Sequence, residues 1–223
     1  MFDIVEEKDI HRVFSTRALV YVITHGETEG QGSERLSEKG QNQIAELARS
    51  RVATGVHAIF TSTMKEAAAT AEILAKEFGV TVESRPCLVD AAISKGRPSP
   101  RQLADRLPIM WDDVNHTPIG GESFNVARRR FGDCMNYVGE KSVGDTVAVV
   151  THPLIAALFL SMVKGGGPIL EDWLYMGHAS CATYEYSSGG WSLVMPPDDS
   201  YLSETTSVAD MLPRDLLHRL HAE

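Results

Sequence analysis

Short apolar runs rich in β-branched residues alternate with longer amphipathic segments along this chain, and this alternation most constrains its fold. The runs are ALVYVIT at 18–24, VHAIFTS at 56–62, VTVES at 80–84 and DTVAVVT at 145–151. Apolar residues recur at helical spacing in the segments 37–52, 65–79, 123–138 and 153–164. Strands that alternate with helices predict a three-layer α/β/α sandwich with a mainly parallel central sheet.

The rest of the chain adds smaller features to this one predicted domain of residues 1–223. Residues 1–17 form an N-terminal extension, and the Pro-, Gly- and Arg-rich segment 91–121 is predicted to be an irregular cap or lid over the sheet. Residues 179–196 resemble a hairpin that turns at a Gly-Gly pair. The C-terminal tail, 198–223, is polar and then weakly amphipathic.

Composition and charge exclude several classes of protein. Of the 223 residues, 43% are hydrophobic, which argues against a disordered chain. The net charge of −9 disfavours nucleic acid and anionic membranes as partners, and the longest apolar run is too short to span a bilayer. The three cysteines, Cys87, Cys134 and Cys181, form no C-x-x-C pair, so we expect no disulfide framework, no zinc site and a reducing, cytoplasmic setting.

Two of the predicted strands end in almost the same way. VYVITHG places His25 just past the first strand, and VAVVTHP places His152 just past a later one. Ligands of open α/β sheets bind beyond the carboxyl ends of the strands. If the two strands are parallel neighbours, both imidazoles lie in the same crevice and form a candidate active site.

Four blocks of sequence, taken in order, resemble the histidine phosphatase (phosphoglycerate-mutase-like) superfamily. They are THGET followed by LSEKGQNQIAELA, then IFTSTMKEAAATAEILA, then GGES, and finally VVTHP. Together they cover roughly residues 18–195. The resemblance implies the phosphoglycerate-mutase-like variant of the α/β/α fold.

The resemblance also implies a mechanism of phosphoryl transfer. His25 would be the nucleophile that forms a phosphohistidine, and His152 would flank and stabilise the transferring group. A carboxylic acid would protonate the leaving oxygen, with Asp90 in the LVD stretch as first choice and Glu122 in GGES as second. The same blocks assign substrate contacts to Thr24, Gly26, Glu27, Glu66 and Thr151.

Two central positions depart from the family pattern. Thr24 and Glu66 stand where the family has the arginines that hold phosphate. A charge-assisted hydrogen bond contributes roughly 1.5–3 kcal/mol. A carboxylate about 5 Å from a phosphate charge adds about 3 kcal/mol of repulsion at an effective dielectric constant of 20. We therefore expect ordinary phosphomonoesterase activity to be weak. In addition, Pro153 replaces the glycine that follows the second histidine.

Three hypotheses fit these departures. The chain is a family enzyme for an unidentified small molecule, in which other cations replace the arginines: Lys65, Arg97, Arg101 or Arg128. Alternatively it is an inactive ligand-binding or partner-binding protein. In the third, the pocket performs acid–base or hydrolytic chemistry on a non-phosphate substrate.

On the third hypothesis, nearby carboxylates would raise the pKa of at least one of the two histidines above its usual value of about 6.5. Two imidazoles and carboxylates can also coordinate a divalent cation, but we assign neither a metal nor a cofactor from the sequence. A homodimer is compatible with the sequence.

Overall fold

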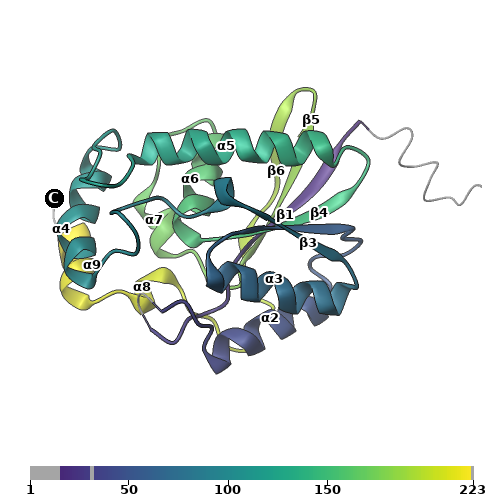
Figure 1. Ribbon diagram of the computed structural model, residues 1–223, viewed down its shortest axis with the longest axis horizontal. Coiled ribbons are helices and arrows are strands. Elements are labelled where there is room, and N and C mark those ends of the chain that lie inside the picture. The colour runs from purple at the N-terminus through teal and green to yellow at the C-terminus, as the bar shows by residue number, and fades with distance from the viewer. Residues whose placement is uncertain (1–15, 31–32, 222–223) are drawn as a thin grey trace, which may run out of the picture.

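A six-stranded sheet forms the centre of the computed structural model, which describes residues 16–30 and 33–221 (Figure 1). The strands, in chain order, are β1 (Ala18–Thr24), β2 (Ala58–Ser62), β3 (Thr81–Arg85), β4 (Thr146–Thr151), β5 (Cys181–Ser187) and β6 (Gly190–Asp198). Their order across the sheet is β3-β2-β4-β1-β5-β6. The strands β3, β2, β4 and β1 pair in parallel. β5 is antiparallel to β1, and β6 is antiparallel to β5. The predicted mainly parallel α/β/α fold is confirmed.

Alternation along the central strands produces a hydrophobic core on each face of the sheet. In β1, Val20 and Val22 point into one core, whereas Tyr21 and Ile23 point into the other. The first core packs against α5 (Phe124–Lys141) and α6 (Pro153–Val163), and the second against α2 (Glu38–Ser50) and α3 (Lys65–Phe78). Figure 1 shows these pairs of helices on opposite sides of the sheet.

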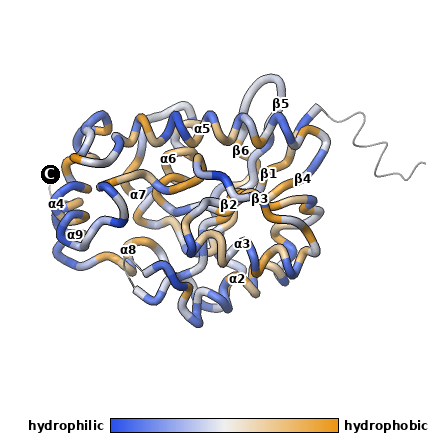
Figure 2. Tube along the Cα trace, viewed as in Figure 1, coloured by the Kyte–Doolittle hydropathy of each residue, from blue (hydrophilic) through white to orange (hydrophobic). Residues whose placement is uncertain are grey.

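The helices α2, α5 and α6 begin where the sequence predicts. Ser37 and Ser123 accept backbone hydrogen bonds as N-caps of α2 and α5, and Pro153 opens α6. Every residue from Pro153 to Ser161 is buried, so α6 is apolar on all sides, and it is largely orange in Figure 2. His152 is the N-cap residue between β4 and this buried helix, which places it at the edge of the sheet.

The segment 91–121 is more regular than predicted. It contains the 13-residue helix α4 (Pro100–Asp112), which begins with a capping box between Ser99 and Gln102. The proline and arginine content suggested an irregular segment, but Pro100 occupies the first helical turn, where proline is favourable. The prediction was therefore wrong for residues 100–112; the role of this segment as a lid remains a prediction.

The C-terminal part packs back onto the domain. β5 and β6 form the predicted hairpin, with Gly190 at a positive φ of 97° in the turn. Three short helices belong to this part or precede the hairpin: α7 (Leu170–Leu174), α8 (Val208–Met211) and α9 (Arg214–Leu220). In Figure 1, α9 lies beside α4 at one end of the molecule.

One prediction about the cysteines is wrong. Cys87, in the 3₁₀ turn η1 (Pro86–Leu88), and Cys134 on α5 form a disulfide across a sequence separation of 47 residues. Their distance in sequence concealed the pair, because only the fold brings η1 against α5. The argument for a reducing compartment loses its basis. None of the helices formed by the described ranges is long and apolar enough to cross a membrane.

Candidate active site

His25 and His152 lie side by side at the carboxyl edge of the sheet. β1 and β4 are parallel neighbours with Thr24 opposite Thr151, so the residue after each strand enters the same crevice. The backbone N–H of His25 donates to the carbonyl of Thr151 at 2.9 Å. The centroids of the two imidazole rings are 5.2 Å apart, and both side chains are buried.

The two rings are oriented by hydrogen bonds on one nitrogen each. Nδ1 of His25 lies 2.8 Å from the carbonyl oxygen of Gly26, which can only accept, so this nitrogen carries the proton. Nε2 of His25 therefore keeps its lone pair. Nε2 of His152 lies 2.8 Å from Oγ of Ser62, and its Nδ1 faces Oε1 of Glu66 at 3.7 Å. Each imidazole thus presents one nitrogen to the pocket.

Burial keeps both imidazoles neutral. Desolvation is the main reason that the pKa of His25 falls to about 4, and the charge of Arg97 lowers it further against the opposing hydrogen bond to Gly26. Burial and the neighbouring His25 likewise hold the pKa of His152 well below 6.5. The expectation of a protonated histidine is wrong, because desolvation outweighs the nearby carboxylates.

Glu66, which stands where the family has an arginine, lies beside the two histidines. It stands in the first turn of α3, is only 3% exposed, and groups with His25 and His152 so that one donor atom from each lies within 4.8 Å of the others. Its Oε1 accepts from Nη2 of Arg97 at 2.6 Å. Burial raises the pKa of Glu66 even though Arg97 lowers it.

Arg97 is the one of the four proposed replacement cations that the structure brings to this carboxylate. It comes from the segment 91–121, between η1 and α4. Lys65 pairs with Glu34, and the exposed Arg101 pairs with Asp105 at 3.7 Å. Arg128 donates to the carbonyl of Gly166. Arg97 neutralises Glu66, so the ion pair leaves little net positive charge in the pocket.

Thr24 and Thr151 are buried with their hydroxyl groups bonded to the backbone. Oγ1 of Thr24 donates to the carbonyl of Gly177 at 2.7 Å and accepts from the N–H of Ser180 at 2.9 Å. Oγ1 of Thr151 donates to the carbonyl of Leu88 at 2.8 Å. These bonds join β1 and β4 to the neighbouring loops, so both threonines have a structural function besides any contact with substrate.

Of the two candidate acids, Asp90 has the more suitable environment. Its Oδ1 accepts from the N–H groups of Ala91 and Ile155, at 2.9 and 3.1 Å, so it also caps the first turn of α6. Burial is the main cause that raises its pKa to about 7. Glu122, by contrast, forms an ion pair with Arg130 at 2.6 Å and accepts from the N–H of Ala92.

Arg130 on α5 organises the loop that carries Asp90. Its guanidinium donates to the carbonyls of Cys87, Val89 and Asp90 and to the carboxylate of Glu122. The sequence does not single out this arginine, since nothing in its helical context distinguishes it from its neighbours. Its hydrogen bonds fix the backbone on which the candidate acid stands.

The loop after His25 is held by α2 and by the C-terminal segment. A Cβ on Gly26 would lie 2.6 Å from the carbonyl oxygen of Gly40, so only glycine allows this approach. The carboxylate of Glu27 accepts from Ser37 at 2.9 Å and from Thr206 at 2.5 Å. These contacts explain the spacing between the THGET and LSEKG motifs in physical terms.

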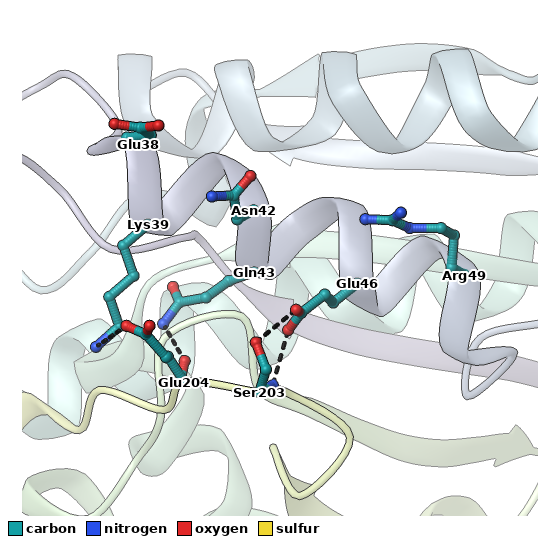
Figure 3. A pocket seen from close by; sticks show the side chains of 8 residues that line it. All are labelled: Glu38, Lys39, Asn42, Gln43, Glu46, Arg49, Ser203 and Glu204. Atoms are coloured by element: carbon teal, nitrogen blue, oxygen red, sulfur yellow. Dashed lines mark hydrogen bonds and ion pairs between the residues drawn. The ribbon is translucent and has the colours of Figure 1, made fainter.

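A polar hollow beside α2 is separate from the histidine pair. Figure 3 shows it between the outer face of α2 and the segment that carries Ser203 and Glu204. Both carboxylate oxygens of Glu46 bind Ser203, and Nε2 of Gln43 donates to the carbonyl of Glu204. The lining groups pair across the hollow and fasten the C-terminal segment to α2, and neither histidine belongs to it.

A third histidine in the site was missed by the sequence analysis. His178 is 6% exposed, and its ring centroid lies 5.1 Å from that of His25. It precedes β5, and because β5 is antiparallel to β1, the start of β5 lies at the carboxyl end of β1. The available sequence signal was the predicted hairpin at 179–196. If that hairpin lies next to the first strand, the residue that precedes it, His178, lies near the end of that strand. Burial lowers its pKa to about 3.

Replacing His178 with Gln is expected to flatten the dependence of stability on pH. A histidine whose pKa in the folded state is depressed stabilises the fold fully above pH 6.5, and this contribution is lost as the pH falls towards 3. Between pH 8 and pH 5 the loss is about 2 kcal/mol for His178. Asp90 acts in the opposite direction because its pKa is raised, but it does so in both proteins. Urea unfolding of wild type and His178→Gln at both pH values measures the difference; parallel profiles would contradict it.

The fold and the geometry of the site define a class of protein. A mainly parallel sheet holds two neutral imidazoles at its carboxyl edge, one with a free nitrogen lone pair, together with a carboxylic acid of raised pKa. This is an α/β protein with a histidine-pair site suited to nucleophilic catalysis. The chain belongs to the histidine phosphatase superfamily (branch 1), whose family model matches residues 20–199.

A curated relative agrees with this membership, and two solved structures share the fold. A probable phosphoglycerate mutase GpmB of Cronobacter sakazakii is 27% identical over 77% of this chain and 86% of its own length. The structure of YhfR from Bacillus stearothermophilus superimposes with a TM-score of 0.71 at 24% identity, covering 82% of this chain and 98% of that one. A mycobacterial glucosyl-3-phosphoglycerate phosphatase gives a TM-score of 0.66 at 20% identity, covering 80% and 98%.

Proposed function

We propose that this protein is an enzyme that transfers the phosphoryl group of a small-molecule substrate through His25 and is weak on ordinary phosphomonoesters. The observation that carries the proposal is the state of His25. Its Nδ1 is bonded to the carbonyl of Gly26, its pKa is about 4, and its Nε2 therefore offers a lone pair at neutral pH. An imidazole in this state is a ready nucleophile.

The proposed reaction has two steps. Nε2 of His25 forms a bond to phosphorus as the bond from phosphorus to the leaving oxygen breaks, and Asp90 gives its proton to that oxygen. Water then attacks phosphorus, the N–P bond breaks, and the Asp90 carboxylate takes the proton from water. A pKa of about 7 leaves Asp90 partly protonated at neutral pH and suits both directions of transfer. His152 flanks the transferring group.

Electrostatics explains the expected weakness on phosphomonoesters. At pH 7 both imidazoles are neutral, and the charge of Arg97 is largely offset by Glu66. A phosphate dianion entering this pocket exchanges its hydration for little positive charge, and such desolvation is unfavourable. The pocket therefore favours a phosphoryl group of lower charge or a substrate that brings its own cation.

Replacing Asp90 with Asn should reveal the acid through the leaving group. An amide cannot supply the proton, so we expect turnover of an alkyl phosphate to fall by about 10²–10⁴-fold. A nitrophenyl phosphate, whose leaving oxygen needs no proton, should lose much less. Steady-state rates of both substrates with both proteins give the comparison. Equal losses for the two substrates would show that Asp90 acts only by capping α6.

Glu122→Gln is the matched comparison for this test. Glu122 pairs with Arg130 and has the second claim on the acid role. If Asp90 is the acid, Glu122→Gln should not change the ratio of the two rates. If the ratio of the two rates changed in Glu122→Gln and not in Asp90→Asn, Glu122 would be the acid instead. A homodimer stays a prediction, as does a cytoplasmic location, although the disulfide removes the argument that the cysteines gave for it.

A further inference from the structure

The three side chains at the centre of the pocket have the composition of a transition-metal site. Within the described ranges, His25, Glu66 and His152 each offer one ligand atom, and these atoms all lie within 4.8 Å of one another. We propose that these residues bind a divalent transition-metal ion of the zinc class through Nε2 of His25, Nδ1 of His152 and the Glu66 carboxylate. Two imidazoles and one carboxylate with a position left for water are a ligand set that zinc accepts.

The second nitrogen of each imidazole supports this assignment. Metal-bound histidines usually donate their other N–H to an oxygen, which fixes the tautomer and the ring. Nδ1 of His25 donates to the carbonyl of Gly26, and Nε2 of His152 lies 2.8 Å from Oγ of Ser62. Both rings are therefore oriented through one nitrogen, and the remaining nitrogen of His152, Nδ1, faces Glu66 at 3.7 Å. Neither ring would need to change its partner when an ion binds.

An unsatisfied oxygen on Glu66 is the second, independent observation. Oε1 accepts from Arg97, but the buried Oε2 has no hydrogen-bond partner among the described residues. A buried carboxylate oxygen without a partner is unfavourable. A cation between Oε2 and the two ring nitrogens would satisfy it. Ligands about 2.0–2.1 Å from the ion lie roughly 3.3 Å apart in a tetrahedral site, so the three groups need only a modest closure.

The positive charge of Arg97 disfavours a bound metal ion. Replacing Arg97 is therefore expected to change the affinities for cations and for anions in opposite directions. Its guanidinium shares the Glu66 carboxylate and repels any further cation. Removing this charge should strengthen metal binding, whereas it should weaken the binding of any anion. If the four side chains had only a structural role, removing the charge would not be expected to change cation and anion binding in opposite directions.

Metal binding would compete with the proposed phosphoryl transfer. Both use the lone pair on Nε2 of His25, so an ion bound there prevents attack on phosphorus. This consequence rests on the proposed function, but the metal site itself does not. Zinc should inhibit any turnover that depends on His25, and removal of the ion should restore it.

The direct experiment is calorimetric titration of the full, untagged chain with zinc chloride after treatment with a chelator. We expect one site per chain, with affinity reduced at least tenfold by His25→Ala and by Glu66→Gln. Arg97→Gln should raise the affinity severalfold or more. Replacing the exposed Arg101 or His57 with Gln should change nothing. Cobalt(II) should give the intense visible absorption of a four-coordinate site.

Circular dichroism and thermal unfolding of each variant establish that the fold is intact, and Glu66→Asp serves as a second variant if Glu66→Gln fails to fold. Absence of zinc binding in the micromolar range would overturn the proposal. Zinc affinity that is unchanged in the His25 and Glu66 variants would overturn it as well. If phosphohistidine forms but zinc does not bind, only the metal site is overturned. If zinc binds but no phosphohistidine forms, only the proposed reaction is overturned.

Discussion

Replacing His25 with Ala is expected to abolish phosphoryl transfer. Without the imidazole there is no side chain at the end of β1 to form the N–P bond, and His152 keeps one nitrogen on Ser62 and turns the other towards Glu66. We expect turnover of a nitrophenyl phosphate to fall by about 10³-fold or more, which corresponds to ~4 kcal/mol in the activation barrier. Because the wild-type rate is itself expected to be low, the assay needs high enzyme concentration.

The control for this loss is another histidine of the same chain. His57 is exposed, and its side chain takes no part in the site, so His57→Ala should retain the wild-type rate. Contaminating phosphatase would show as activity that survives in His25→Ala. Rapid turnover that depends on His25 would instead contradict the expected weakness and mean that Arg97 compensates for both missing arginines.

Replacing Gly40 with Ala is expected to destabilise the fold near the site by about 3 kcal/mol, at the upper end of overpacking effects. Gly40 lies in the first turn of α2 against the backbone of Glu27, and a Cβ there would lie 2.0 Å from the carbonyl oxygen of Glu27. The loop that carries His25 and Glu27 must move, because the added Cβ would meet backbone atoms and not the end of a flexible side chain. Chemical denaturation measures the loss.

Gly167→Ala is the matched control for this substitution. A Cβ on Gly167 meets no atom within 4 Å, so its free energy of unfolding should change by less than about 0.5 kcal/mol. If Gly40→Ala were as stable as the control, α2 would not be packed as closely on the site loop as the structure indicates. Since Glu27 accepts bonds from Ser37 and Thr206, the variant should also loosen the C-terminal segment.

Local patterns predicted the fold because they are set by neighbours in sequence. β-branched runs, serine N-caps and Pro153 act within a few residues, and the strands and helices that they predict are present. The adjacency of His25 and His152 followed from one further assumption, that their strands are parallel neighbours. β1 and β4 satisfy it.

What the sequence could not predict depends on contacts between distant segments. Arg97 meets Glu66 only because the segment before α4 folds over the sheet edge, and Cys87 meets Cys134 only because η1 packs on α5. The protonation of the histidines was misjudged for a related reason. Sequence shows which charges are near, but the desolvation that lowers the pKa of His25 depends on how completely the fold encloses it.

The measurement that tests the central claim most directly is detection of a phosphoryl group on His25. The protein would be mixed with a large excess of nitrophenyl phosphate, quenched in alkali, where phosphohistidine survives, and analysed by intact mass and peptide mapping. We predict one added phosphoryl group, located on His25, in wild type and in Asp90→Asn, and none in His25→Ala. Turnover of the same substrate with no phosphorylated His25 at any time would contradict the account.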